Sequence, residues 1–247
     1  MKRFLNWQVI FGLTLIILSV TVYFIHYLIF RDLHHIFIYL IGDIAFVFIE
    51  VLLVTLVLHQ LLHYREKRAM LNKLNMVIGA FFSEVGLELL RKFSSFDREA
   101  SKITQKLIVN NDWSEKKFFI IRKSVCTHNY RIDSKSKDLE YLKEFLKEKR
   151  QFLLSLLENP NLLEHESFTN LLWAVFHLTE ELIYRKSLNG LLASDYEHLA
   201  GDIKRVYNLL LAEWLDYMKH LKNDYPYLFS LAMRTNPFDA NASVEVG

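Results

Sequence analysis

The chain has 247 residues, of which 30 are Lys or Arg and 28 are Asp or Glu, so its formal net charge is only +2 at pH 7. Nucleic-acid-binding proteins usually carry a clear basic excess or stripe, so this balance argues against nucleic acid as a partner. The single cysteine, Cys126, excludes an intramolecular disulfide and argues against a cysteine-based zinc site.

The first quarter of the chain is composed unlike the rest. Residues 4–30 contain no Asp, Glu, Lys or Arg, and residues 33–64 contain no Lys or Arg. About 20 apolar residues suffice to cross the hydrocarbon of a bilayer as a helix. We therefore predict a transmembrane hairpin over residues 1–64, with spans at about 7–30 and 36–58 and a tight linker between them. The first apolar stretch is too long for a cleaved signal peptide, and no small-residue cleavage site follows it.

The orientation of this hairpin follows from the basic residues that flank it. Cytoplasmic flanks of membrane spans carry an excess of Lys and Arg. The linker has only Arg31, whereas both outer flanks are richer in basic residues, which are Lys2, Arg3, Arg65, Lys67, Arg68 and Lys73. We expect both termini to be cytoplasmic, in a plasma or inner membrane, with membrane lipid as the immediate surroundings.

Two acidic residues, Asp43 and Glu50, lie inside the second apolar stretch. A carboxylate at bilayer depth is costly and is kept where it finds a partner or a water-filled path. In an antiparallel hairpin, residues at equal depth have numbers that sum to a constant, so polar side chains of the first span fall beside the acids. These side chains are Tyr23 and His26 beside Asp43, and Thr14 and Ser19 beside Glu50.

Two interpretations of these acids follow. In the first, each acid is hydrogen-bonded to the first span and locks the hairpin or an oligomer of hairpins. In the second, the acids line a proton or cation path at an oligomer axis, which two spans cannot enclose without further copies. The polar partners within reach favour the first interpretation.

Helical periodicity continues beyond the second span without a proline, which predicts a stalk helix over residues 65–93. Gly79, Ser83 and Gly86 fall on one face of this helix. Small residues in such a row allow close helix approach. The row predicts a packing seam against the following domain or against a second copy, and favours a homo-oligomer.

We predict that residues 94–233 form a cytoplasmic helical domain. Its first part is ambiguous, because residues 106–122 fit either helices or a β-hairpin. We favour helices near 102–109 and 114–125, with a capping-box spacing of Asp112 and Glu115.

The last third of the chain has clearer apolar stripes of helical period. They predict helices at 138–157 and 167–186, a helix from a capping box of Ser194 and Glu197 to about residue 222, and a short helix at 225–233. Residues 234–247 are expected to form an irregular tail, with aromatic residues near it exposed. The fold class is therefore all-α, a transmembrane hairpin that continues into an antiparallel helical bundle.

A metal site between bundle helices is the best enzymatic candidate. The residues considered are Asp195, His198, Asp202, His177, Glu180, Glu181, Asp216 and His220. Di-metal carboxylate bundles use a Glu-x-x-His motif, which this chain lacks. Each acid–histidine set also borders an apolar stripe, where solvated charges normally lie, so we favour a wetted helix face with salt bridges over a metal ligand set.

The absence of other catalytic and nucleotide-binding motifs argues against several activities. The chain has neither a phosphate-cradling glycine loop, nor a G-x-S-x-G elbow, nor an H-E-x-x-H motif. We expect no cofactor and no catalytic residue. The sequence favours a membrane-anchored, non-catalytic scaffold or regulatory module with a possible cytoplasmic protein partner, and the alternative is a conducting element that uses Asp43 and Glu50.

Overall fold

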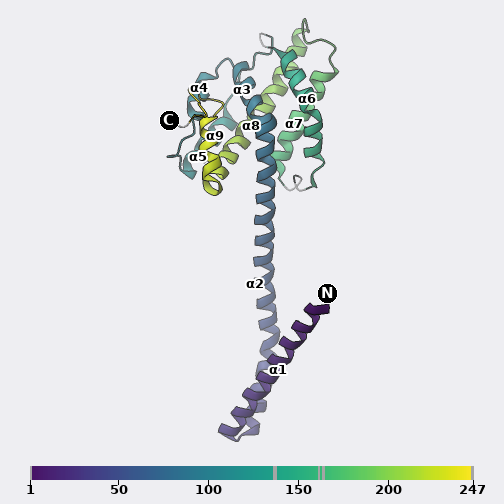
Figure 1. Cartoon of the computed structure of the whole chain (residues 1–247), viewed down its shortest axis with the longest axis vertical. Helices are drawn as coiled ribbons and strands as arrows, with labels where there is room; N and C mark the ends of the chain where they lie inside the picture. The colour runs from purple at the N-terminus through teal and green to yellow at the C-terminus, as the bar shows by residue number, and fades with distance from the viewer. Residues whose placement is uncertain (1, 136–137, 161, 163–164, 246–247) are drawn as a thin grey trace. The chain divides into compact units, whose positions relative to one another are not determined.

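The computed structural model describes residues 2–135, 138–160, 162 and 165–245, without the side chains of residues 2–6, 8, 67–69, 71 and 72 (Figure 1). Within these residues the chain is helical and forms no strand, and an isolated bridge joins Asp97 to Ile132. The predicted all-α class is confirmed. The chain divides into two compact units, Met1–Lys67 and Arg68–Gly247.

The first unit consists of α1 (Lys2–Phe30) and the beginning of α2 (Leu33–Phe81). The turn between them is only two residues long. Arg31 adopts a left-handed conformation with φ 50°, and the Asp32 carboxylate accepts a hydrogen bond of 3.2 Å from the His35 amide. This aspartate therefore caps the amino end of α2. The segments Val9–Phe30 and Leu33–Glu66 are long and apolar enough to cross a membrane, and no part of either is buried.

The helix α2 leads into a π-helical turn, η1 (Phe82–Gly86), and then into α3 (Leu87–Phe96). The sequence predicted a helix here but not its π turn. Phe81 precedes this turn and Phe82 begins it, and both side chains are buried. Such π turns are rare in proteins and often mark functional positions.

Residues 97–135 resolve the ambiguity of the sequence in favour of helices. They form α4 (Ser101–Thr104), the short 3₁₀ turn η2 (Gln105–Leu107) and α5 (Glu115–Thr127). The β-hairpin alternative is wrong. The cap of α5 also differs from the expectation, since the Ser114 hydroxyl accepts from the Lys117 amide, whereas the Asp112 amide bonds to Asn110.

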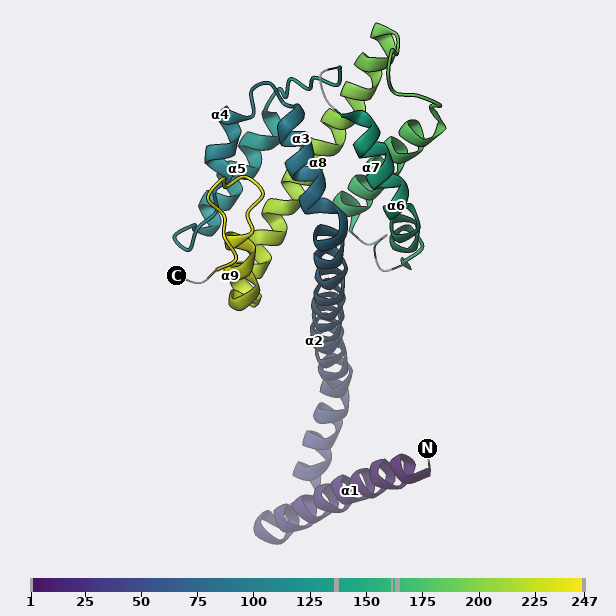
Figure 2. The same cartoon turned by 45° about the horizontal axis from the view of Figure 1, so that its top comes forward.

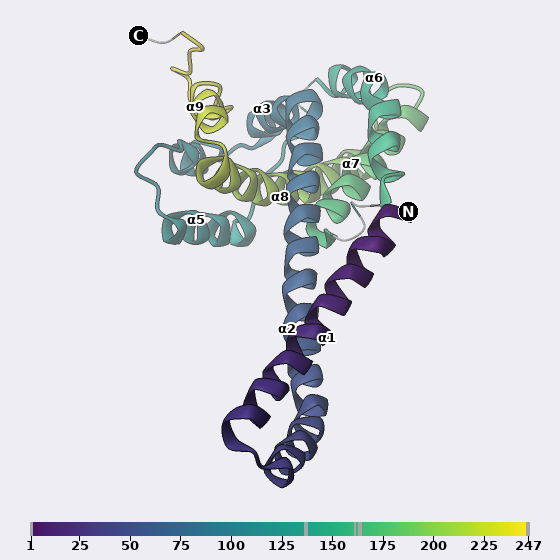
Figure 3. The same ribbon diagram turned by 60° about the horizontal axis from the view of Figure 1, so that its bottom comes forward.

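The last third contains α6 (Leu139–Leu157), α7 (Glu166–Tyr184), α8 (Ala193–Asp224) and α9 (Pro226–Arg234). Figures 2 and 3 show α8 at the centre of the second unit, where it contacts α3, α5, α7 and α9, while α6 packs on α7. The apolar stripe predicted for α8 is buried, including Leu199, Ile203, Val206, Leu210, Trp214, Met218 and Leu221. The predicted cap at Ser194 is wrong, because α8 begins one residue earlier and Leu192 precedes it.

The irregular segment after α9 packs into the core. The Asn236 amide donates a hydrogen bond of 3.0 Å to the Leu107 carbonyl oxygen, and the Phe238 ring meets Trp214 at a centroid distance of 5.2 Å. Both residues are buried. The expectation of exposed aromatics near the tail therefore holds for Tyr227 but not for Phe238.

Candidate functional site

Of the polar residues singled out in the apolar helices, Tyr23 and Asp43 come together. The Tyr23 hydroxyl donates a hydrogen bond of 3.3 Å to Oδ2 of Asp43 and so joins α1 to α2. The neighbouring His26 instead packs its ring against Phe30, at a centroid distance of 4.7 Å.

The second acid, Glu50, is not joined to the residues expected beside it. The Thr14 hydroxyl donates to the Ile10 carbonyl oxygen of its own helix, at 2.8 Å. Glu50 and Ser19 are exposed, and among the described residues no hydrogen bond or ion pair engages either side chain. Their pairing therefore stays a prediction.

The residues of the small-residue seam have three different surroundings. A Cβ added at Gly79 would lie 3.1 Å from the Tyr217 hydroxyl of α8, so this glycine allows a close approach within the domain. Gly86 is buried beside Phe82, and Ser83 is exposed. Gly79 and Ser83 also line an apolar groove of about 400 Å³ formed with residues of α8 and α9.

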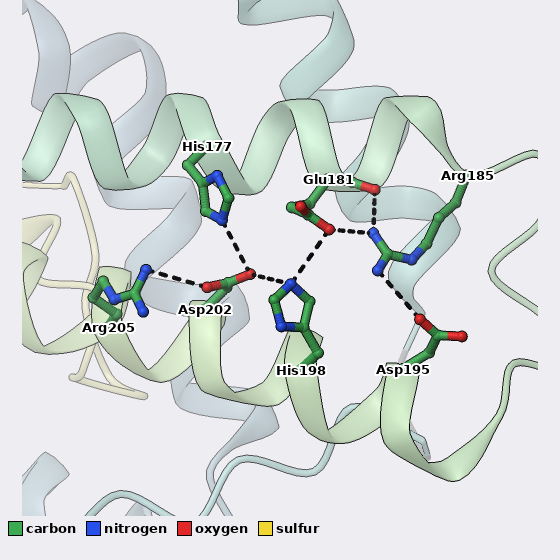
Figure 4. A network of polar contacts seen from close by, with 7 residues as sticks. All are labelled: His177, Glu181, Arg185, Asp195, His198, Asp202 and Arg205. Carbon is green, nitrogen blue, oxygen red and sulfur yellow. Dashed lines mark hydrogen bonds and ion pairs between the residues drawn. The ribbon is translucent and has the colours of Figure 1, made fainter.

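The densest cluster of titratable side chains lies between α7 and α8 (Figure 4). His177 and Glu181 lie one turn apart on α7, and His198 and Asp202 lie one turn apart on α8, so each pair shares a helix face. Figure 4 shows the two pairs facing each other. His177 Nε2 lies 3.5 Å from Asp202 Oδ2, and His198 Nε2 lies 3.3 Å from the same oxygen.

Asp202 is the buried centre of this cluster. Its side chain is 4% exposed, whereas those of His177 and His198 are 47% and 52% exposed. Its Oδ1 atom faces Arg205 at 3.3 Å, but its buried Oδ2 atom accepts no hydrogen bond from any described residue. The two histidine contacts are therefore close approaches of a nitrogen to a carboxylate oxygen that do not meet hydrogen-bond geometry.

The other half of the cluster is a salt bridge network. The Arg185 guanidinium donates to Glu181 Oε2 at 2.6 Å and to Asp195 Oδ1 at 3.4 Å. The Arg185 hydrogen bond, together with the charges of Arg185, His198 and His177, holds the pKa of the Glu181 carboxyl below its usual value. The same Oε2 atom of Glu181 lies 3.4 Å from His198 Nε2.

The other metal candidates of the sequence belong to separate ion pairs. Glu180 pairs with Arg150 at 2.8 Å, and Asp216 pairs with Arg122 at 2.7 Å. His220 pairs with Asp224 rather than with Asp216, through an Nδ1–Oδ2 distance of 2.8 Å. Arg185 and Arg205 were not predicted as members of the cluster, although each lies one turn from an acid of the cluster on its own helix.

Comparison with known proteins assigns the chain to a family in both of its units. Residues 70–234 match the family described as "Uncharacterized protein MJ1433, C-terminal helical domain", and residues 2–62 match "MJ1433, N-terminal helical domain". The chain belongs to the MJ1433 family. It is 47% identical to the protein "Uncharacterized protein MJ1433" of Methanocaldococcus jannaschii over 234 residues. These residues cover 95% of this chain and 94% of that protein.

The two MJ1433 domains coincide with the structural division of the chain. The N-terminal match lies within Met1–Lys67, and the C-terminal match lies within Arg68–Gly247. Both family descriptions name helical domains, in agreement with the helices found here. No solved structure matches the chain.

Proposed function

We propose that this MJ1433-family chain is a two-pass integral membrane protein whose helical domain is a non-catalytic scaffold or regulatory interaction module in the cytoplasm. The observation that carries the proposal is the exposure of two long apolar helical segments, Val9–Phe30 and Leu33–Glu66. Soluble proteins rarely expose contiguous apolar patches larger than a few hundred Å². Helices also satisfy their backbone hydrogen bonds internally, as a bilayer requires.

The hairpin topology and the cytoplasmic location rest on the flanking charges. The two-residue turn at Arg31 and Asp32 leaves room only for an antiparallel return. Basic residues are concentrated at the amino terminus and from Arg65 onward. The positive-inside rule then places both termini, and the helical domain, on the cytoplasmic side. Contacts between the consecutive helices α6, α7 and α8 support an antiparallel bundle for that domain.

An interaction role is supported by the apolar groove that Gly79 and Ser83 help to line. Leu228 and Leu231 of α9 line the same groove and are 39% and 42% exposed. Exposed leucines beside a concave apolar surface are typical of binding surfaces. We propose a second copy of the chain as the occupant, so that the protein self-associates through this groove.

The experiment is size-exclusion chromatography with light scattering on the full chain in mild detergent, combined with cross-linking in cells. Leu231→Glu should weaken self-association at least about tenfold, since it places a charge in an apolar contact. Leu192→Glu is the matched control, because Leu192 is exposed but lies outside the groove. A wild-type chain that stays monomeric and cross-links to no other protein would contradict the interaction role.

The alternative is an oligomeric proton- or cation-conducting element. It is supported by Glu50, an acid in the apolar part of α2 that no described residue engages by a hydrogen bond or ion pair. Flux into liposomes that contain the wild-type chain, compared with a Glu50→Gln and Asp43→Asn double variant, separates the two proposals. Wild-type flux equal to that of the double variant and of empty liposomes excludes conduction.

A further inference from the structure

We propose that His177, His198 and Asp202 form a binding site for a divalent transition-metal cation of the zinc type, which joins α7 to α8. Their three potential ligand atoms lie within 4.8 Å of one another. Two imidazole nitrogens and one carboxylate oxygen form a donor set suited to zinc and similar ions, and less suited to calcium or magnesium. The inference is independent of the membrane topology and of self-association.

The two distances to the carboxylate oxygen fit the geometry of such an ion. In a tetrahedral zinc centre with bonds of about 2.0–2.2 Å, neighbouring ligand atoms lie about 3.3–3.6 Å apart. The two distances from Asp202 Oδ2 to the histidine Nε2 atoms are 3.3 and 3.5 Å. Both nitrogens therefore already lie at ligand spacing from the carboxylate oxygen, and neither donates a hydrogen bond to it.

The second observation that points to a ligand is the state of the Asp202 carboxylate. A buried carboxylate oxygen without a hydrogen bond is costly, because burial removes its hydration. Asp202 Oδ2 is in this state and is directed between the two imidazoles (Figure 4). Arg205 faces the other oxygen at 3.3 Å and would orient the carboxylate, as residues that contact metal ligands commonly do.

The cluster also offers an entry path and an open position. His177 and His198 are about half exposed, so a cation can reach their nitrogens from solvent. Three protein ligands leave a fourth position for water or for another group. Glu181 lies beside that position, 3.4 Å from His198 Nε2, and is held there by Arg185. Since α7 and α8 each supply a ligand, the cation would stabilise the contact between these helices.

The competing explanation is a metal-free ion pair, in which protonated His177 or His198 partners Asp202. This explanation accounts for the same distances but predicts no stoichiometric cation binding. The full chain in detergent, stripped of metal with a chelator, is therefore titrated with Zn²⁺ and, separately, with Co²⁺, whose visible spectrum reports tetrahedral coordination by nitrogen and oxygen.

We expect one Zn²⁺ per chain and a rise in melting temperature with added Zn²⁺, since a ligand that binds the folded state stabilises it. His198→Ala and Asp202→Asn should each weaken binding at least about tenfold. The control is a His59→Ala and His63→Ala double variant, because these exposed histidines are also four residues apart on one helix. Its cation binding at the α7–α8 site should equal that of the wild type.

Circular dichroism checks that each variant is folded. If Asp202→Asn is unfolded, His177→Gln replaces it in the test, because this side chain is half exposed and its loss leaves the core intact. The proposal is overturned if the wild type binds no stoichiometric Zn²⁺ or Co²⁺. It is equally overturned if folded His177 and His198 variants bind as tightly as the wild type, which would indicate adventitious binding elsewhere.

Discussion

Tyr23 and Asp43 are linked by a hydrogen bond of 3.3 Å from the phenol to Oδ2 of the carboxylate, across twenty positions of sequence. The bond connects the two apolar helices that lie on either side of the turn at Arg31 and Asp32. An acid at membrane depth is costly unless it is paired. This pairing supports a role for Asp43 in holding the hairpin together rather than in moving ions.

We expect a double-mutant cycle of Tyr23→Phe and Asp43→Ala to show a coupling free energy of about 0.6 kcal/mol and at most about 1.7 kcal/mol, the average and the maximum for side-chain hydrogen bonds between membrane helices. The unfolding free energy of each variant is measured in bicelles by steric trapping. Tyr27→Phe is the control, since among the described residues its exposed hydroxyl makes no hydrogen bond. If Tyr23 and Asp43 show no coupling, the hairpin does not depend on their bond.

Substitution of Gly by Ala should have opposite effects on the free energy of unfolding at two helical glycines. A Cβ at Gly86 would lie 2.5 Å from Cδ1 of Phe82, a buried ring that stacks on Tyr217, whereas nothing lies within 4 Å of a Cβ at Gly201. Gly86→Ala should lower the free energy of unfolding by about 1–3 kcal/mol through overpacking. Gly201→Ala should raise it by about 0.4–1 kcal/mol by restricting the unfolded chain.

Denaturant unfolding of the full chain in detergent, followed by circular dichroism, measures both effects. Equal effects of the two substitutions would show that the π turn of η1 relaxes freely around a new methyl group.

The small-residue seam of Gly79, Ser83 and Gly86 illustrates what the sequence can and cannot predict. The row of small residues predicted a close approach of another helix along one face, and Gly79 lies close to Tyr217 of α8. The spacing assumed a regular α-helix, however, and the π turn at Phe82–Gly86 changes the rotation of every residue after it.

From the sequence, the members of the titratable cluster between α7 and α8 could be recognised only as separate sets of acids and histidines, each on one helix. The spacing of His198 and Asp202 predicts that they share a face of one helix, as they do. It does not predict that His177 of another helix meets the same carboxylate, because the rotation of α7 about its axis is set by the packing of its apolar residues on α6 and α8. The burial of Asp202 follows from that packing, whereas His177 and His198 are half exposed and Glu181 forms a salt bridge with Arg185.

A third prediction concerns Glu213, a buried carboxyl of α8. Burial raises its pKa above the usual value, although a Ser167 hydrogen bond and the charges of His165 and Arg122 act in the opposite direction. The folded chain then holds this proton to higher pH than the unfolded chain does, so the residue's contribution to stability falls as pH rises from about 4 through the folded pKa.

Glu213→Gln removes this titration. Its free energy of unfolding, relative to the wild type, should therefore increase with pH above about 4 and level off once the wild-type carboxyl is ionised. Glu197→Gln on the same helix removes an exposed carboxylate and should change stability by less than about 0.5 kcal/mol at every pH. A wild-type-minus-variant difference that does not vary with pH would show that Glu213 titrates normally.

The central claim, a two-pass protein with its helical domain in the cytoplasm, is tested most directly by the labelling of cysteines with a membrane-impermeant maleimide in intact and in opened cells. Cys126 of α5 is the only cysteine of the chain and is exposed, so the wild type carries its own reporter. A second reporter is His34→Cys in a Cys126→Ser background, at an exposed position beside the turn between the two apolar helices. We predict that the wild type is labelled only after the membrane is opened, and that the second reporter is labelled in intact cells. Labelling of Cys126 in intact cells, or release of the protein from membranes by alkaline carbonate, would contradict the account.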